Sequence, residues 1–79
     1  MARVTVVLPQ FGMGMTDGEM VNWLKKVGDT VSEGEILVEV EAAKATVEVP
    51  ATASGTLVEI IAAEGETVDV RAPIAVIET

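Results

Sequence analysis

The sequence predicts an all-β fold made of two similar halves, and the spacing of its apolar and glycine residues supports this class. Short runs rich in valine and isoleucine alternate with polar residues at a period of two, which is typical of half-buried strands. No apolar stripe at helical spacing appears, so no substantial helix is expected. Glycines separate the runs at intervals typical of a sandwich or barrel: Gly18, Gly28, Gly34, Gly55 and Gly65.

Three strand-like runs are expected in the first half of the chain. Residues 3–9 (RVTVVLP) alternate and end at a proline, which cannot donate a ladder hydrogen bond. Residues 20–25 (MVNWLK) follow a glycine, and Val21 and Trp23 are expected to share the buried face because they lie two positions apart. Residues 36–41 (ILVEVE) also follow a glycine and alternate again.

The second half repeats this organisation with three further runs. Residues 45–50 (ATVEVP) again end at a proline, residues 56–61 (TLVEII) follow a glycine, and residues 74–78 (IAVIE) follow a proline. Their β-branched content favours strands in each case.

Composition bounds the class of protein. The 79 residues fit one domain, residues 1–79, with a net charge of −8. The absence of cysteine excludes disulfides and thiolate metal sites, and the absence of histidine removes the commonest general base and metal ligand. A negative field repels nucleic acid and anionic lipid and favours basic partners, and no apolar run reaches membrane-spanning length. We expect a soluble cytoplasmic module (mitochondrial matrix if eukaryotic) that binds neither nucleic acid nor membrane.

The two halves match when the chain is shifted by 37 residues. Upstream the shift becomes 41, which places Thr5 on Thr46 and Pro9 on Pro50 and leaves four extra residues within Gln10–Asp17. Since each half is too small to bury a sheet face alone, the repeat predicts a pseudo-symmetric pair. The identical pairs at the shift of 37 are Gly18/Gly55, Val21/Val58, Gly28/Gly65, Thr30/Thr67, Val31/Val68 and Glu41/Glu78.

A change of parity around Lys44 predicts a tight hairpin at that lysine. The apolar residues Ile36, Val38 and Val40 before it are even-numbered and Val47 and Val49 after it are odd-numbered, which one straight strand cannot accommodate. A turn with Ala43 and Lys44 as its central residues resolves the conflict and puts Lys44 at the tip. The predicted register places Val38 opposite Val49, Glu39 opposite Glu48, Val40 opposite Val47 and Glu41 opposite Thr46.

The residues of this turn disagree with its predicted geometry. Two-residue hairpins favour Asn-Gly or Asp-Gly because they need positive φ twice, whereas this sequence offers Ala43-Lys44. The facing glutamates add a small repulsion. Such local disagreement is typical of functional positions. The alternative is that Lys44 merely solvates a turn tip.

Four segments of the chain, taken together, resemble the lipoyl domains of 2-oxo-acid dehydrogenase complexes. The resemblance covers essentially all of residues 3–78, and the order of the motifs makes it specific. The segments are LPQFGMGMTDGEMVNWL (8–24), KVGDTVSEGEILVEVE (26–41), EAAKATVEVP (41–50) and ASGTLVEIIAAEGETVDV (53–70).

The attachment hairpin of that family usually reads Glu-Thr-Asp-Lys-Ala, and here Glu41, Lys44 and Ala45 match it while Ala42 and Ala43 depart from it. The resemblance implies a flattened barrel or sandwich of two four-stranded antiparallel sheets related by a pseudo-twofold axis. It also implies that lipoic acid is attached to Lys44 through an amide, so that the domain is a non-catalytic swinging-arm carrier.

The resemblance further implies a set of partners. A lipoate ligase or lipoyl transferase would load Lys44. A thiamine-diphosphate-dependent 2-oxo-acid decarboxylase would then acylate the lipoyl group reductively, an acyltransferase catalytic domain would pass the acyl group to coenzyme A, and dihydrolipoamide dehydrogenase would reoxidise the carrier. The chain is expected to form part of a dihydrolipoamide acyltransferase polypeptide and to be monomeric as an isolated domain.

Two groups of residues are candidates for partner recognition. In the family, the loop corresponding to Gln10, Phe11, Gly12 and Met13 helps the decarboxylase to recognise its own domain. The alternative is that the apolar residues of Gln10–Asp17, namely Phe11, Met13 and Met15, plug one end of the core. A second group consists of acids beside the predicted hairpin, which could dock basic partners or simply be solvated. These acids are Glu39, Glu41 and Glu48.

Two other functions remain open at this stage. Glu41-Ala42 is also how the biotinyl attachment signature Glu-Ala-Met-Lys-Met begins, so a biotinyl carrier of a carboxylase is one alternative, although alanines rather than methionines flank Lys44. The other alternative is an unmodified β-sandwich adaptor, in which Lys44 stays free.

Overall fold

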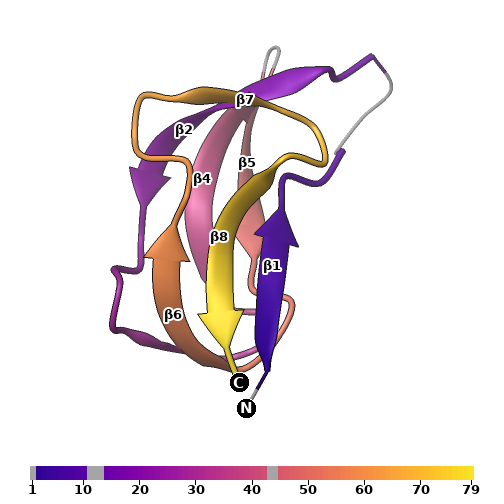
Figure 1. Ribbon diagram of the computed structural model, residues 1–79. Helices are drawn as coiled ribbons and strands as arrows, with labels where there is room; N and C mark the ends of the chain where they lie inside the picture. Colours follow the sequence, from indigo (N-terminus) through magenta and orange to yellow (C-terminus); the bar gives the residue numbers. More distant parts are fainter. Residues whose placement is uncertain (1, 11–13, 43–44) are drawn as a thin grey trace.

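The computed structural model describes residues 2–10, 14–42 and 45–79, which form two four-stranded sheets with antiparallel pairing throughout (Figure 1). The sheet that we call the terminal sheet has the order β1 (Arg3–Val7), β8 (Pro73–Glu78), β6 (Gly55–Ile60) and β3 (Thr30–Val31). The hairpin sheet has the order β5 (Ala45–Pro50), β4 (Ile36–Ala42), β2 (Asp17–Trp23) and β7 (Thr67–Asp69). The predicted all-β fold is confirmed. Within the described ranges no helix is long and apolar enough to cross a membrane.

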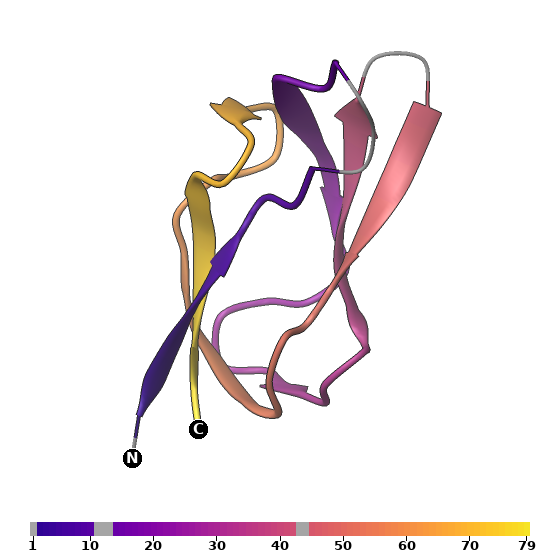
Figure 2. The same cartoon turned by 90° about the vertical axis from the view of Figure 1, so that its right-hand side faces the viewer.

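The two sheets lie face to face with an apolar core between them (Figure 2). No polar or charged residue in the described part of the chain is buried. Each large aliphatic side chain in such a core contributes roughly 1.5–3 kcal/mol relative to exposure. The largest fully buried side chains are Leu8, Met20, Leu37, Leu57, Ile74 and Ile77.

The two halves of the chain are structurally equivalent. Exchanging each of β1, β2, β3 and β4 with β5, β6, β7 and β8 converts the order of the terminal sheet into that of the hairpin sheet. Backbone hydrogen bonds repeat in the same way. The amide of Gly28 donates to the carbonyl of Leu57 over 2.7 Å, and Gly65, 37 residues later, donates to Met20 over 2.7 Å. The predicted pseudo-symmetric pair is confirmed.

The equivalence of β1 with β5 corrects the shift expected upstream. Val6 pairs with Ala75 of β8, as Val49 pairs with Val38 of β4. Val6 is therefore equivalent to Val49, a shift of 43 residues rather than 41, and the first half carries six extra residues (43 − 37). The two shifts differ by two residues, which preserves the faces of a strand, so the apolar pattern could not separate them.

A β-bulge at Val21 overturns its predicted orientation. The register skips Val21 in β2, and it skips Val58 at the equivalent point of β6. Since a bulge reverses the alternation, Val21 is 44% exposed while Trp23 packs against the core. The prediction that both side chains share the buried face is therefore wrong, although Trp23 itself is partly buried as expected. Its indole Nε1 donates to the carbonyl of Ala62 over 2.8 Å.

A second bulge recurs in both halves, at Leu37 and Ile74. It places Leu37 in the core next to Val38, so two consecutive side chains of β4 are fully buried. The run was expected to bury even-numbered positions only. The extra residue accounts for the difference, because each bulge lets one additional side chain turn inward.

Two glycines occupy equivalent points where neighbouring atoms leave no room for a Cβ. A Cβ added to Gly55 would overlap the carbonyl oxygen of Glu78 and would lie 2.9 Å from its carbonyl carbon. A Cβ added to Gly18 would lie 2.5 Å from Cγ1 of Val40. These contacts explain why both positions of the repeat hold glycine.

We expect Gly55→Ala to lower the free energy of unfolding by about 3 kcal/mol. The backbone of Glu78 in β8 cannot move away without breaking its pairing with β1 or β6. Urea unfolding followed by tryptophan fluorescence measures this. Thr52→Ala, at an exposed position outside the strands, is the control and should change stability by less than about 0.5 kcal/mol. Equal midpoints for Gly55→Ala and the control would contradict the close approach.

A salt bridge of 2.9 Å joins Nζ of Lys25 to Oε2 of Glu35. The hydrogen bond from Lys25 and a second one from the amide of Ser32 lower the pKa of the Glu35 carboxyl below its ordinary value of 4.5. The folded protein thus favours the ionised form of Glu35. This contribution to stability is present above the ordinary pKa and is lost as the pH falls through the lowered one.

We expect Lys25→Met to raise the pKa of Glu35 towards 4.5, and the neighbouring Lys26→Met to leave it unchanged. Carbon-13 NMR titration of the side-chain carboxyls measures both values. The stability difference between wild type and Lys25→Met should shrink in acid, where Glu35 is protonated in every state. An identical titration midpoint in the two variants would show that the salt bridge does not persist in solution.

Candidate functional site

The hairpin formed by β4 and β5 has the register expected from the sequence. Its Cα partners are Val38/Val49, Glu39/Glu48, Val40/Val47, Glu41/Thr46 and Ala42/Ala45. The last pair brings the ends of the two strands opposite one another. Ala43 and Lys44, which join those ends in the sequence, lie outside the described residues, so the turn geometry and the role of Lys44 stay predictions.

The inner face of this hairpin is anchored in the core up to its end. Val38, Val40 and Val49 are fully buried, and Ala42 retains only 8% of its exposure. On the outer face, Glu41 and Thr46 are exposed, and Ala45, the partner of Ala42 on the inner face, is exposed as well. The strands therefore form a supported platform of backbone ladder and buried valines that ends at Ala42 and Ala45.

The segment between β1 and β2, residues 8–16, which we call the first-half loop, has its ends attached at the same end of the molecule. The amide of Arg71 donates to the carbonyl of Leu8 over 2.7 Å, and the amide of Val70 donates to Thr16 over 3.0 Å, so both ends of residues 8–16 are tied to the turn after β7. That turn is adjacent to the start of β2, because Asp17 pairs with Asp69. The described ends of this loop, the turn after β7 and the joined ends of β4 and β5 therefore lie at one end of the molecule (Figure 1).

The structure supports a packing role for part of this loop. Met15 is buried at 8% exposure and belongs to the core, which confirms that one of the loop's apolar residues plugs the end of the sandwich. Gln10 is exposed, and its amide nitrogen donates to the carbonyl of Met15 over 3.4 Å. Phe11, Gly12 and Met13 lie outside the described residues, and their expected role in partner recognition stays a prediction.

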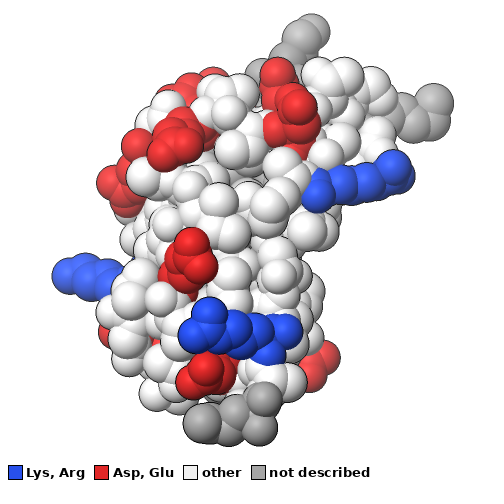
Figure 3. All heavy atoms as spheres, viewed as in Figure 1, with Lys and Arg blue, Asp and Glu red and all other residues white. Residues whose placement is uncertain are grey.

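Charge is divided unequally between the two sheets. The strands of the hairpin sheet carry six acids and neither lysine nor arginine, whereas those of the terminal sheet carry Glu59, Glu78 and Arg3. Arg3 and Glu78 form an ion pair of 3.5 Å, and the strands of this face are mostly uncharged in Figure 3. The six acids, which we call the acidic face, are Asp17, Glu19, Glu39, Glu41, Glu48 and Asp69.

The acids of the acidic face stand opposite one another across the strands. The register pairs Asp17 with Asp69, Glu19 with Glu41, and Glu39 with Glu48. Directly opposed like charges are destabilising by roughly 0.2–1 kcal/mol per pair. Asn22 relieves one of them, since its Nδ2 donates to Oε1 of Glu39 over 3.2 Å.

Sequence reasoning identified only the part of the acidic face that lies on the hairpin. Asp17, Glu19 and Asp69 were missed, because their membership depends on β2 and β7 joining the hairpin sheet, which no local pattern specifies. Among the described residues, no group of three or more acids is arranged to hold a metal ion. Acids in this number on the surface of one sheet attract a basic partner by charge.

Known proteins resemble this chain over nearly its whole length. The family model described as biotin-requiring enzyme matches residues 4–77. The acetyltransferase component of the pyruvate dehydrogenase complex of Corynebacterium glutamicum is 47% identical over 74 residues, which are 94% of this chain and 11% of that protein. The succinyltransferase component of the 2-oxoglutarate dehydrogenase complex of Staphylococcus saprophyticus is 44% identical over 72 residues, 91% of this chain and 17% of that protein.

A solved structure agrees with these relatives. The lipoyl domain of the 2-oxoglutarate dehydrogenase complex of Azotobacter vinelandii superposes with a TM-score of 0.77 at 32% identity, covering 96% of each chain. The chain thus spans a small part of the acyltransferase components but 96% of a lipoyl domain solved on its own. By the match of its sequence and fold, the chain belongs to the biotin/lipoyl attachment family, as a lipoyl-type domain.

Proposed function

We propose that the chain is a lipoyl carrier domain whose prosthetic group is attached to Lys44. The observation that carries the proposal is the pairing of Ala42 with Ala45, which makes Lys44 one of only two residues connecting the ends of β4 and β5. An amide between lipoic acid and the ε-amine of Lys44 would remove its charge and extend a long arm from this end. The lipoyl group, when bound, supplies the acyl-transfer and redox chemistry.

The domain itself contributes support and presentation. The buried side chains of Val40 and Val49 hold the hairpin on the core, so the arm would move while its base stays fixed. Tethering raises the effective concentration of the carried group at each partner's active site without any new contact. Neither histidine nor cysteine is present to act as a catalytic base or nucleophile, which agrees with a carrier role.

The relatives support a place within a 2-oxo-acid dehydrogenase complex. Both are acyltransferase components, and the chain aligns with only 11–17% of their lengths. We infer a segment of a dihydrolipoamide acyltransferase, loaded by a lipoate ligase or transferase and visited in turn by a thiamine-diphosphate decarboxylase, the acyltransferase catalytic domain and dihydrolipoamide dehydrogenase. The compartment would be the cytoplasm, or the mitochondrial matrix in a eukaryote.

Loading by lipoate tests the proposal directly. Incubation with lipoate ligase, lipoate and ATP should add one lipoyl group, located by peptide mapping on the peptide containing Lys44. The variant Lys44→Ala should add none, and Lys25 and Lys26 serve as internal controls in the same digest. A parallel reaction with biotin ligase and biotin should leave the mass unchanged.

Other outcomes of this experiment would contradict the proposal. A biotinyl group on Lys44 would assign the domain to carboxyl transfer, as the description of the family allows. An unmodified lysine after both reactions would favour the adaptor function instead.

The acidic face should accelerate encounter with the decarboxylase. We expect Glu19→Gln combined with Glu48→Gln to slow reductive acylation of the loaded domain about threefold at low salt, because two carboxylates that steer a basic partner are lost. The difference should vanish near 0.5 M salt, where screening acts within roughly 4 Å. Glu33→Gln combined with Glu59→Gln changes net charge equally away from this face and is the control. Equal rates for the two double variants would show that the acids only solubilise the domain.

A further inference from the structure

Arg71 has a backbone conformation that its side chain disfavours. Among the described residues other than glycine, it is the one with positive φ, at 69°. The left-handed region costs a residue with a Cβ roughly 1–2 kcal/mol relative to glycine. Persistent strain of this kind concentrates at functional positions, where the side chain outweighs the local cost.

The pseudo-symmetry supplies a reference for this position. Gly34 lies 37 residues before Arg71 and has a φ of 91°. The amide of Gly34 donates to Ala51 over 2.9 Å, as the amide of Arg71 donates to Leu8 over 2.7 Å. The two turns are therefore the same turn, and glycine satisfies it without strain. The backbone explains the conformation, but it does not explain why the residue is arginine.

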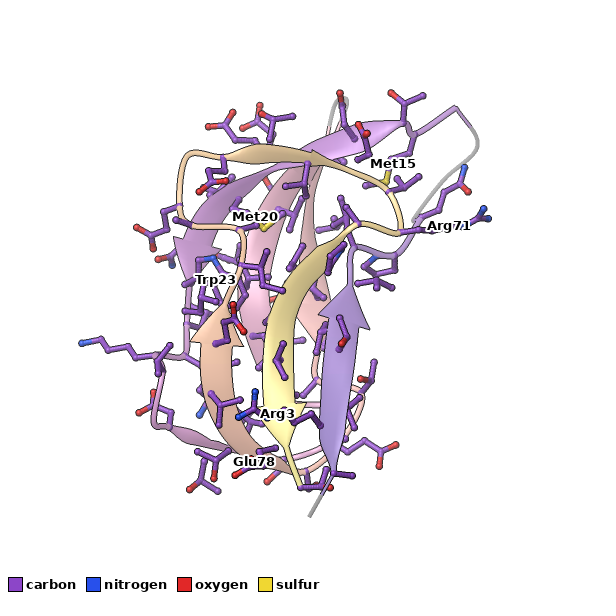
Figure 4. All side chains as sticks on the ribbon, in the orientation of Figure 1. Arg3, Met15, Met20, Trp23, Arg71 and Glu78 are labelled. Atoms are coloured by element: carbon purple, nitrogen blue, oxygen red, sulfur yellow. The ribbon has the colours of Figure 1, made fainter. Side chains whose placement is uncertain are left out.

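Packing and internal ion pairs do not explain Arg71 either. Its side chain is exposed and points away from the body of the domain (Figure 4). The ion pairs among the described residues are Arg3 with Glu78 and Lys25 with Glu35, so Arg71 does not neutralise the nearby Asp69. The guanidinium is thus held in solvent, free to meet a group from another molecule.

Arg71 lies at the end of the domain that holds Ala42 and Ala45, which we call the carrier end. Arg71 follows β7, whose Asp69 pairs with the first residue of β2, and it is bonded to Leu8 at the start of the first-half loop. The other described cations lie elsewhere: Arg3 begins β1 beside the chain ends, and Lys25 and Lys26 follow the opposite end of β2. Arg71 is therefore the described cation at the hairpin end, next to the acidic face.

We propose that Arg71 is a specificity-determining residue that binds a carboxylate on the decarboxylase that acylates the carried group. This inference rests on the proposed function. An acidic face attracts any basic surface and sets encounter rate, but it leaves the orientation of the partner poorly defined. A single guanidinium at its edge, with a planar fork suited to bidentate carboxylate binding, requires one acidic group at one place and so fixes the docked orientation. Partners that are basic at that place are rejected by like charge.

The experiment compares four variants of the lipoylated domain as substrates. Arg71→Gln removes the charge, Arg71→Lys keeps the charge without the fork, and Arg71→Gly also removes the backbone strain. Arg3→Gln is the matched control, since it changes net charge equally at the far end. Lipoyl loading is checked by mass. The decarboxylase components of pyruvate and 2-oxoglutarate dehydrogenase complexes are each assayed, and the one that acylates the wild-type domain faster is used throughout.

We expect Arg71→Gln and Arg71→Gly to raise KM for the domain about tenfold with kcat unchanged, the loss expected for one charge-assisted hydrogen-bonded pair. Arg71→Lys should recover part of the loss, and Arg3→Gln should match wild type. The melting temperature of Arg71→Gly should meanwhile rise by about 4 °C as the strain is removed. If the role of Arg71 were purely structural, Arg71→Gln and Arg71→Gly would instead lower the melting temperature and raise KM together.

Two failures are distinguishable. A wild-type domain that is loaded with lipoate but acylated by neither decarboxylase would overturn the proposed function, and this inference with it. Equal KM values for wild type, Arg71→Gln and Arg3→Gln would overturn the role of Arg71 alone and leave the carrier function intact.

Discussion

The structure depends on the interleaving of its two halves. Each sheet takes two strands from each half: β1 and β3 join β6 and β8 in one, and β2 and β4 join β5 and β7 in the other. The crossings are held by reciprocal backbone bonds, such as those from Gly28 to Leu57 and from Gly65 to Met20. Neither half can complete a sheet or a core alone, so folding is expected to be cooperative over the whole chain.

This constraint also positions the carrier end. Because β2 lies between β4 and β7, the start of β2, the end of β7 and the Ala42/Ala45 end of the hairpin occupy one end of the domain. The ends of the first-half loop, Arg71 and the acids Asp17, Glu41 and Asp69 consequently lie at the same end of the domain as Ala42 and Ala45. Among these residues, only the acids of the hairpin are close to Lys44 in sequence.

Much of the fold could be predicted from the sequence because its signals are local or repeated. The parity change around Lys44 specified the hairpin register residue by residue, and the shift of 37 specified two equivalent halves. The errors arose where the two-residue period loses information. It cannot distinguish a shift of 41 from one of 43, and it fails at Val21 and Leu37, where an extra residue reverses the alternation. The acids contributed by β2 and β7 could not be predicted, since they join the hairpin only through long-range pairing.

The same symmetry gives the chain ends a mechanical meaning. The amide of Thr79 donates to the carbonyl of Ala2 over 2.8 Å, and Arg3 pairs with Glu78 as Thr46 pairs with Glu41. The termini therefore occupy the place that is equivalent, in the other sheet, to the Ala42/Ala45 end of the hairpin. The two places lie at opposite poles of a body 36 Å long (Figure 1). Any linker attached at a terminus would hold the domain by the pole farthest from the hairpin end, where we propose that the lipoyl group is attached. The folded body would then act as a rigid extension of the tether and would lengthen the radius that the arm can sweep.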